Sequence, residues 1–444
     1  MEQGFLAGFG RADITPEQYC GLAGFGNDGD RICNFVKDRI YVTCVAISDE
    51  TGSTVLLITV DLLQGKETTT VKLGREAITA ATGIPGERIM IGGTHTHSGP
   101  SMYTMEDESQ AIYLRHLYRQ LAKAAKEAVE DQKPAQLYFG SRQVENMTFV
   151  RHYLMKDGTY AGSNFGSFKS GIVRHLWPAD EQLQMLRFHR QNARDIVMVN
   201  WQSHGTFVGH PSEGVLSADY IGAFRDHFEG LTGCHVGFYQ GACGNLVPTS
   251  RIPELNRVGE KDHIGYGRLL AEEAVACMET LTQAEPGPVK RTQRIYQGEV
   301  DHSDDHLAEK ARYVRSHGWE LETWAERAKL AKDNGFNSIF HAANVDDRSR
   351  LPKTLAMEID AVRVGPVAFA TAPYEMFCSN GQYVKEHSPF RQTFVLGYCN
   401  GSFSYLADEN AYAYNCYEVN ARRFSKGVSE DVACQLVEML QELQ

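Results

Sequence analysis

Concentrated positive charge is missing from this sequence. Its 444 residues include 44 Lys and Arg against 56 Asp and Glu, which gives a formal net charge of −12, and no stretch is rich in Lys or Arg. Binding to a phosphate backbone requires clustered positive charge. The composition therefore argues against nucleic acid as a partner.

Long hydrophobic runs are missing as well. The longest, such as Thr54–Leu63, are far too short to span a bilayer, and the N-terminus lacks the basic start and apolar stretch of a secretory signal. The ten cysteines form no CxxC pair and no regular spacing, so we expect reduced and mostly buried thiols. Together these features predict a cytoplasmic protein without stable membrane insertion.

Patterns typical of strands and of helices alternate along most of the chain. Tyr41–Ser48 and Ile196–Trp201 have the β-branched or apolar character of strands, whereas Val428–Leu443 has helical spacing. The segment 146–170 is rich in Gly, Ser, Asn and Tyr and predicts a long functional loop or hairpin. We expect an α/β fold with central mixed β-sheets flanked by helices. It would form a single catalytic domain over residues 1–444, with a helical excursion at about 302–335.

Two histidines follow the short buried strand expected at Ile89–Ile91. Residues 93–100 read GTHTHSGP, which places His95 and His97 one residue apart. Alternate side chains of an extended chain project to the same side, so both rings can reach one metal ion. The motif is short, and the alternative is a pair of polar residues in an ordinary loop.

Two further strand ends carry candidate metal ligands. His204 follows the strand 196–201, and Glu375 follows an apolar strand and stands at the start of an expected helix. Taken alone, His204 is more often structural and Glu375 could simply favour the helix dipole. A His, His, Glu set is nevertheless the usual composition of a catalytic zinc site with an open position. Asp219, at the start of another helix, could cap it or hold the outer nitrogen of a ligating histidine, and the pattern leaves both roles open.

Four segments resemble the neutral, non-lysosomal ceramidase family. They read GFGRADITP at 8–16, GTHTHSGP at 93–100, QGACGNLVP at 240–248 and NGSFSYLADENAYAYNCYE at 400–418. They span nearly the whole chain, so the resemblance covers the family's catalytic domain. We expect a short homologue without the family's C-terminal immunoglobulin-like domain.

The resemblance implies a zinc amidase that binds one Zn²⁺ per chain. The resemblance makes four residues correspond to metal ligands: His95 and Tyr405 in the motifs, the strand-end histidine His204, and Glu375. His97 corresponds to a histidine beside the metal that takes part in catalysis, and Tyr417 to a second active-site tyrosine. The alternative for both tyrosines is plain packing, in a chain with 20 Tyr.

Two positions depart from the family pattern. Gly241 stands where the family has a serine at a substrate-contacting position, and Arg151 is the nearest match for an arginine expected to contact the substrate. Together with the expected cytoplasmic location, the acidic net charge and the polar, aromatic-rich segment 146–170, these departures favour a small, polar N-acyl compound over ceramide.

The resulting hypothesis is a zinc-dependent hydrolase of a small-molecule substrate. A metal-bound hydroxide would attack an amide carbonyl, His97 or Glu375 would accept the proton, and Tyr405 and Tyr417 would stabilise the oxyanion. The same chemistry could serve an ester, a lactone, a glycosidic bond or ceramide itself. A non-catalytic zinc protein is disfavoured because structural zinc sites are dominated by Cys. A homo-oligomer is compatible with the sequence.

Overall fold

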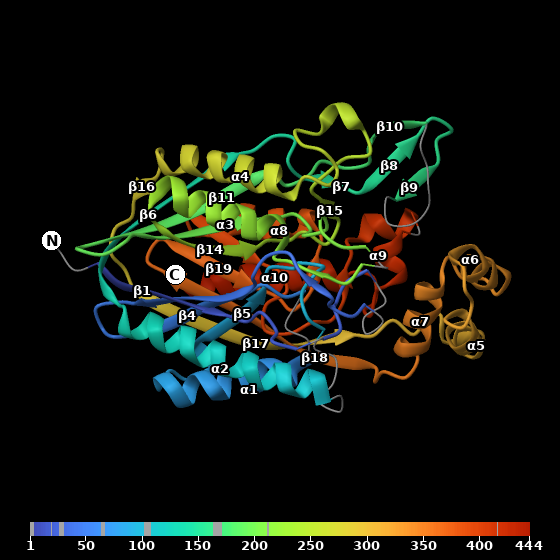
Figure 1. Cartoon of the computed structure of the whole chain (residues 1–444), viewed down its shortest axis with the longest axis horizontal. Helices are drawn as coiled ribbons and strands as arrows, with labels where there is room; N and C mark the ends of the chain where they lie inside the picture. Colours follow the sequence, from blue (N-terminus) through green and yellow to red (C-terminus); the bar gives the residue numbers. More distant parts are fainter. Residues whose placement is uncertain are drawn as a thin grey trace.

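A twisted β-sheet runs through the middle of the molecule (Figure 1). The computed structural model describes residues 4–18, 20–25, 31–63, 67–101, 108–162, 171–210, 213–414 and 416–444. Within them this sheet has nine strands in the order β14-β12-β11-β6-β1-β3-β4-β5, with β16 paired to β6. Neighbours are antiparallel except β4–β5 and β12–β14, so the sheet is mixed. Its strands are β1 (Phe5–Asp13), β3 (Tyr41–Ser48), β4 (Thr54–Val60), β5 (Ile89–Gly93), β6 (Lys133–Gln143), β11 (Gln182–Arg190), β12 (Ile196–Trp201), β14 (His235–Gln240) and β16 (Thr282–Gln283).

A second sheet packs against one face of the first. Its described strands, in the order β17-β18-β19-β21, are β17 (Val289–Glu299), β18 (Thr354–Val364), β19 (Val367–Thr371) and β21 (Gln392–Leu396). Alternate side chains of the large sheet, such as Val45 and Met198, share one buried core with Val362 and Phe369 of the smaller sheet. Because side chains alternate along a strand, the intervening residues face the opposite side of the large sheet.

Helices cover the two outer faces. On the large sheet, α1 (Glu67–Thr82) and α2 (Glu108–Glu130) pack over the β1–β5 half, and α3 (Asp219–Thr232) and α4 (His263–Met278) pack over β11, β12 and β14. On the other side, α8 (Cys378–His387) and α10 (Val428–Glu442) cover the four-stranded sheet. This order of helix, sheet, sheet and helix confirms the predicted α/β fold with central mixed sheets. Among the described helices, none is at once long and apolar enough to cross a membrane.

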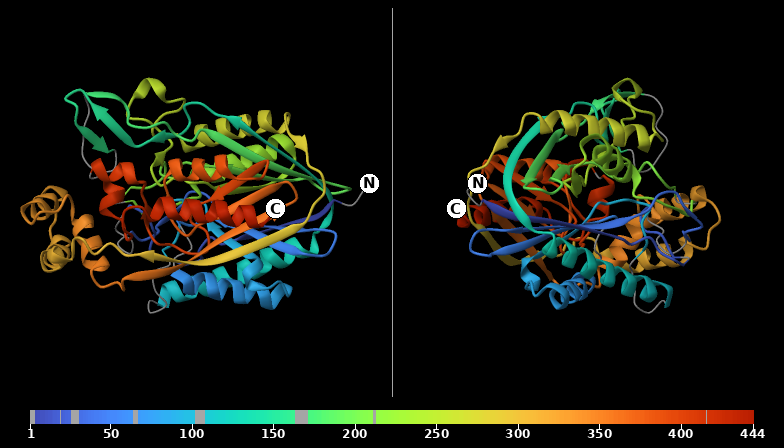
Figure 2. Two further views of the ribbon diagram at one scale, coloured as in Figure 1. Left: turned by 180° about the vertical axis from the view of Figure 1, so that it is seen from behind. Right: turned by 60° about the vertical axis from the view of Figure 1, so that its left-hand side comes forward.

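A helical segment projects from the end of the molecule opposite the N-terminus (Figures 1 and 2). After a 3-10 turn, η3 (Asp305–Leu307), it comprises α5 (Ala308–Gly318), α6 (Trp324–Asp333) and α7 (Ile339–Arg348). Ala311, Phe336 and Val345 belong to a small core of its own. The excursion predicted for 302–335 therefore extends to residue 348, because α7 shares that core. The single-domain boundary of 1–444 stays a prediction.

Short strands and helices connect these layers. The strand pairs are β2 (Phe35–Val36) with β13 (Val215–Leu216), β7 (Phe149–Val150) with β15 (Leu246–Val247), and β20 (Glu375–Met376) with β22 (Tyr405–Leu406). A small sheet contains β8 (His152–Met155), β9 (Tyr160–Gly162) and β10 (Ile172–His175). The short helices are η1 (Gly86–Arg88), η2 (Pro253–Leu255), η4 (Glu409–Tyr414) and α9 (Tyr417–Asn420). The loop or hairpin predicted for 146–170 includes the β8–β9 hairpin, and its residues 163–170 lie outside the described part of the chain.

The large sheet curls until its two edge strands approach each other. β14 contacts β5, and the Tyr239 hydroxyl donates to the carbonyl of Leu57 in β4 (2.9 Å). The segments that leave β5 and β12 meet as a result, although the two strands are far apart in the strand order. This meeting point is where the histidines lie.

Candidate metal centre and active site

The two histidine-bearing segments pair with each other. Thr96 and Gly205 form a parallel bridge, and the backbone N–H of His97 donates to the carbonyl of Gly205 (3.0 Å). One nitrogen each of His95, His97 and His204 lies within 4.8 Å of the others, and the Nε2 atoms of His95 and His97 are 3.3 Å apart. His95 has a φ of +64°, a left-handed conformation that costs about 1–3 kcal/mol and persists where surrounding bonds hold it.

Glu375 reaches the same point from β20, which follows strand β19 of the four-stranded sheet. Its Oε2 lies 3.5 Å from Nε2 of His95 and 3.4 Å from Nε2 of His204. Ligands bound at 2.0–2.1 Å to a tetrahedral zinc ion are separated by about 3.3–3.4 Å, so these separations fit one ion shared by the three atoms. Nε2 of His204 and Oε2 of Glu375 are buried and have no hydrogen-bond partner among the described residues. The donor set therefore fits a divalent metal.

The sequence predicts that Glu375 stands at the start of a helix, and this prediction is wrong. It belongs to β20, and α8 begins three residues later at Cys378. In β20 it pairs in parallel register with Tyr405 of β22. Pairing with β22, rather than a helix dipole, therefore sets its position.

Backbone carbonyls orient two of the imidazole rings. Nδ1 of His95 donates to the carbonyl of Leu63 (2.7 Å), and Nδ1 of His204 donates to that of Leu246 (2.8 Å). Burial, together with Arg151 and His95, lowers the pKa of His204 to about 4. Each ring therefore offers the Nε2 lone pair to the shared point, as partners of the outer nitrogen do in metal sites.

Asp219 does not hold the outer nitrogen of a ligating histidine, one of the two roles predicted for it. Its Oδ2 accepts from the N–H of Val208 and its Oδ1 from that of Tyr220, both at 2.7 Å. The carboxylate thus stabilises the turn into α3. The prediction that it holds a ligating histidine is wrong, because the carbonyls of Leu63 and Leu246 occupy those positions.

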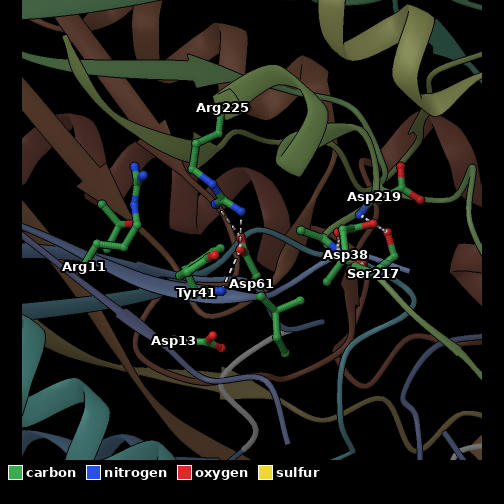
Figure 3. Close-up of polar contacts among 12 residues, drawn as sticks. Arg11, Asp13, Asp38, Tyr41, Asp61, Ser217, Asp219 and Arg225 are labelled. Atoms are coloured by element: carbon green, nitrogen blue, oxygen red, sulfur yellow. Dashed lines mark hydrogen bonds and ion pairs between the residues drawn. The ribbon is translucent and has the colours of Figure 1, made fainter. Parts of the chain in front are cut away.

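A buried ion pair between Asp61 and Arg225 (Figure 3) stabilises the chain that contacts His95. Asp61 follows β4, is 1% exposed and pairs with Arg225 of α3 through two contacts, Oδ2–Nη2 at 2.9 Å and Oδ1–Nη1 at 3.3 Å. The next two residues, Leu62 and Leu63, accept from the backbone N–H and from Nδ1 of His95 (3.0 and 2.7 Å). The Asp61–Arg225 pair therefore anchors the backbone that sets the orientation of this ring.

A second carboxylate, Asp38, is bonded to Ser217 (Figure 3), and Ser217 supports the segment around His97. Asp38 accepts from the Ser217 hydroxyl (2.5 Å) and from the N–H of Ala218 (2.6 Å). The carbonyl of Ser217 accepts from the Thr96 hydroxyl (2.7 Å), and its N–H donates to the carbonyl of Ser98 (3.0 Å). Ser217, just before α3, thus hydrogen-bonds to Thr96 and Ser98, the residues on both sides of His97.

The histidine cluster opens into a cavity of about 640 Å³. Four of the predicted site residues line it: His97, Arg151, Tyr405 and Tyr417. The Arg151 guanidinium lies over the rings of Tyr405 and Tyr417, 5.4 and 5.9 Å from their centroids. Burial, reinforced by the charge of Glu375, raises the pKa of Tyr405 well above its usual value, so its hydroxyl keeps a proton to donate.

Glu418 holds Arg151 in place, a role that the sequence pattern did not reveal. Its Oε1 lies 2.5 Å from Nε of Arg151 and its Oε2 lies 2.9 Å from Nε2 of His152, all in buried positions. Burial alone would raise the pKa of Glu418, but His152 and Arg151 lower it well below its usual value. Glu418 also lies at metal-ligand spacing from His152 and Cys416. Since both of its oxygens are already bonded, the carboxylate is better explained as the partner of these two side chains.

Two glycines of the segment 240–248 serve packing. A Cβ at Gly241 would lie 2.8 Å from Oε1 of Gln202, and Gly241 is not among the cavity-lining residues. Its predicted substrate contact is therefore corrected to close packing on Gln202. At Gly244 a Cβ would lie 2.3 Å from the carbonyl oxygen of Glu375, so only glycine lets this backbone approach β20.

Comparisons with known proteins agree with this architecture. Neutral ceramidase from Pseudomonas aeruginosa matches with a TM-score of 0.73 and 18% identity, over 100% of this chain and 75% of that chain. A structure described as ceramidase complexed with C2 matches with a TM-score of 0.73 and 19% identity over the same shares. No curated protein matches the sequence. At these identities the two structures establish the fold.

The sequence itself establishes the family. The profile described as "Neutral/alkaline non-lysosomal ceramidase, N-terminal" matches residues 5–236, which is more than half of the 444 residues. The predicted resemblance is thereby confirmed. The chain belongs to the neutral/alkaline non-lysosomal ceramidase family, whose members are hydrolases that act on amide bonds.

Proposed function

We propose that the chain is a zinc-dependent amidase that cleaves the N-acyl bond of a small, polar substrate. The observation that carries this proposal is the convergence of His95, His204 and Glu375 next to His97, which lines the cavity; two of the donor atoms have no hydrogen-bond partner among the described residues. A His/Glu donor set beside an open cavity is typical of catalytic zinc, whereas structural zinc sites are closed and rich in Cys.

The residues around these donor atoms have two proposed roles, metal binding and stabilisation of the oxyanion. His95, His204 and Glu375 would hold the ion, with Tyr405 as the proposed fourth ligand. When bound, a zinc ion lowers the pKa of a coordinated water to about 7 and polarises a substrate carbonyl. Tyr417 and Arg151 line the cavity as donors suited to a developing oxyanion.

His97 is the favoured proton acceptor. It lines the cavity and its Nδ1 has no partner among the described residues. Burial, with His95 and His204 nearby, lowers the pKa of His97 well below its usual value, so the ring is neutral and can take a proton and return it to the leaving amine. Glu375 is the less favoured acceptor because its Oε2 lies among the histidine nitrogens. The 3.3 Å separation from His95 would also suit His97 as a ligand, and zinc retention by His97→Ala separates the two roles.

Ceramide is the second candidate substrate, supported by the family membership and by the two ceramidase structures that share the fold. A cavity of about 640 Å³ falls in the range of about 300–1,000 Å³ that accommodates one small ligand. A substrate with a single short chain therefore suits it better than a lipid with two long chains. Esters, lactones and glycosides remain alternatives for the same donors.

The test combines metal analysis with a side-by-side activity screen. Purified protein should contain about one zinc per chain, and His204→Ala and Glu375→Gln should lose most of it. His387→Ala, at an exposed histidine of α8, serves as the control and should keep its zinc. Full zinc retention by both His95→Ala and His204→Ala would refute the ligand assignment. Activity on short N-acyl amides should exceed that on esters, ceramide and aryl glycosides, and turnover of glycosides alone would refute the amidase.

A cytoplasmic location is part of the same proposal. All ten cysteines are free thiols and nine of them are buried, which suits a reducing compartment. Fractionation of cells that express the native gene, with the protein found only in a membrane or secreted fraction, would contradict it.

A further inference from the structure

The cavity reaches from the histidine cluster to the projecting helical segment. Its far wall is formed by residues of α6 and of the start of α7, which are Trp324, Arg327, Ala328, Ile339 and Phe340. The end near His97 carries polar and aromatic side chains, whereas this wall combines apolar and aromatic side chains with Arg327 and the polar residues Asn337 and Ser338. The cavity therefore has a polar reacting end and an amphipathic outer end.

Arg327 is held in a fixed orientation within the wall. Its Cζ lies 4.8 Å from the ring centroid of Trp324 and 5.3 Å from that of Trp319. Nε and Nη2 both donate to the carbonyl of Leu321, at 3.1 and 2.8 Å. Nη1 makes no hydrogen bond within the described part of the chain, and no described carboxylate lies within 4.0 Å of this guanidinium. Nη1 of Arg327, whose guanidinium is already held in one orientation, can therefore donate a hydrogen bond to a ligand.

The other guanidinium groups of the cavity already have counter-charges. Arg151 pairs with Glu418, and Arg251 at the rim lies 3.8 Å from Glu260. Arg327 therefore supplies the uncompensated positive charge of this cavity as far as the described residues go. In a chain of net charge −12, one such charge against an apolar wall gives the outer end a local preference for anions.

We propose that Arg327 and the wall around it bind an anionic group that the substrate carries beyond an apolar stretch, away from the cleaved bond. A carboxylate or sulfate accepts charge-assisted bonds from a guanidinium, and alkyl carbons pack on Trp324 and Phe340. The identity of the cleaved bond rests on the proposed function, but the anion site does not. The substrate class is then an N-acyl compound with a remote acid group, rather than a neutral lipid.

The decisive experiment measures binding without turnover. Decyl sulfate and decanol are titrated into the intact protein while the tryptophan fluorescence is recorded, since Trp324 and Trp319 flank Arg327. Decyl sulfate should bind about tenfold more tightly, as one charge-assisted hydrogen bond predicts. Equal affinities of the two probes for the native protein would overturn the proposal.

Matched variants separate recognition from packing. Arg327→Gln should bind both probes equally, whereas Arg327→Lys should keep part of the preference because it keeps the charge. Arg312→Gln, in the same helical segment but paired with Asp346 at 3.4 Å, should behave as the native protein. A preference for decyl sulfate that survives in Arg327→Gln would show that the anion binds elsewhere.

Kinetics connect this site to the proposed reaction. Anilides of ω-carboxy fatty acids should show a lower KM than their methyl esters, and Arg327→Gln should remove that difference in KM. If no anilide is cleaved while the decyl sulfate preference holds, the amidase proposal fails and the anion site stands. If anilides are cleaved with equal KM and the two decyl probes bind equally, the amidase proposal stands and the anion site fails.

Discussion

Asp61→Asn is the variant that best tests whether the residues behind the metal site hold it in shape. Asp61 touches none of the proposed ligands. It pairs with Arg225, and its chain neighbours Leu62 and Leu63 accept both hydrogen bonds that orient His95. The substitution keeps the size of the side chain and removes its charge.

The magnitude follows from burial. Asp61 is 1% and Arg225 is 5% exposed, so the variant leaves a guanidinium without its counter-charge inside the protein. Breaking a buried pair in this way costs about 3–5 kcal/mol of unfolding free energy. Groups that orient metal ligands change metal affinity by about 10–100-fold when removed. For Asp61→Asn we expect a loss of zinc affinity at the lower end of this range, about tenfold, because Asp61 acts on His95 through the backbone.

The assay is competition for zinc against a chelator, together with urea unfolding of the zinc-free protein. The control is Asp131→Asn, which breaks the pair with Arg190 just after the end of α2 and leaves the Leu62 and Leu63 bonds to His95 in place. The control should lose stability and keep its zinc affinity. Native zinc affinity in a folded Asp61→Asn protein would refute the positioning role, and an equal loss in both variants would show a general effect of instability.

Three further predictions concern neighbouring groups. Glu418→Gln should lower kcat/KM and leave zinc content unchanged, because Arg151 loses its partner while the metal ligands stay; steady-state kinetics with metal analysis checks this. Gly244→Ala should destabilise the fold and lower the zinc content together, since a Cβ there would lie 2.3 Å from the carbonyl oxygen of Glu375, and a normal melting temperature would contradict it. Burial raises the pKa of Asp219 to about 7 in the folded protein, against about 3.9 when unfolded. Its protonated form therefore contributes stability below about pH 4 that is lost as the pH rises through 7, and urea titrations from pH 5 to 8 should lose this downward slope in Asp219→Asn.

The sequence by itself was enough for the fold class and the family, and it singled out the residues to which we assign the proposed chemistry. Continuous apolar and β-branched runs mark strands such as β3 and β12, because both faces of these strands are buried. The GTHTHSGP segment, with three companion motifs, identified the family that the profile match then confirmed. Less regular strands escaped this reasoning. β17, for example, carries Lys, Arg and Gln at many positions and is recognised as a strand only by its pairing with β18.

The tertiary structure alone decided how these residues meet. His95 and His204 come together because the large sheet curls and joins its edges, and Glu375 joins them because a second sheet packs on the first. Glu418 lies 267 positions from Arg151, so no local pattern connects them. The same long-range packing turned Asp219 and Gly241 from site candidates into structural residues and placed Arg327 in the cavity wall. Secondary structure follows from near neighbours along the chain, whereas the convergence of side chains depends on how whole layers pack.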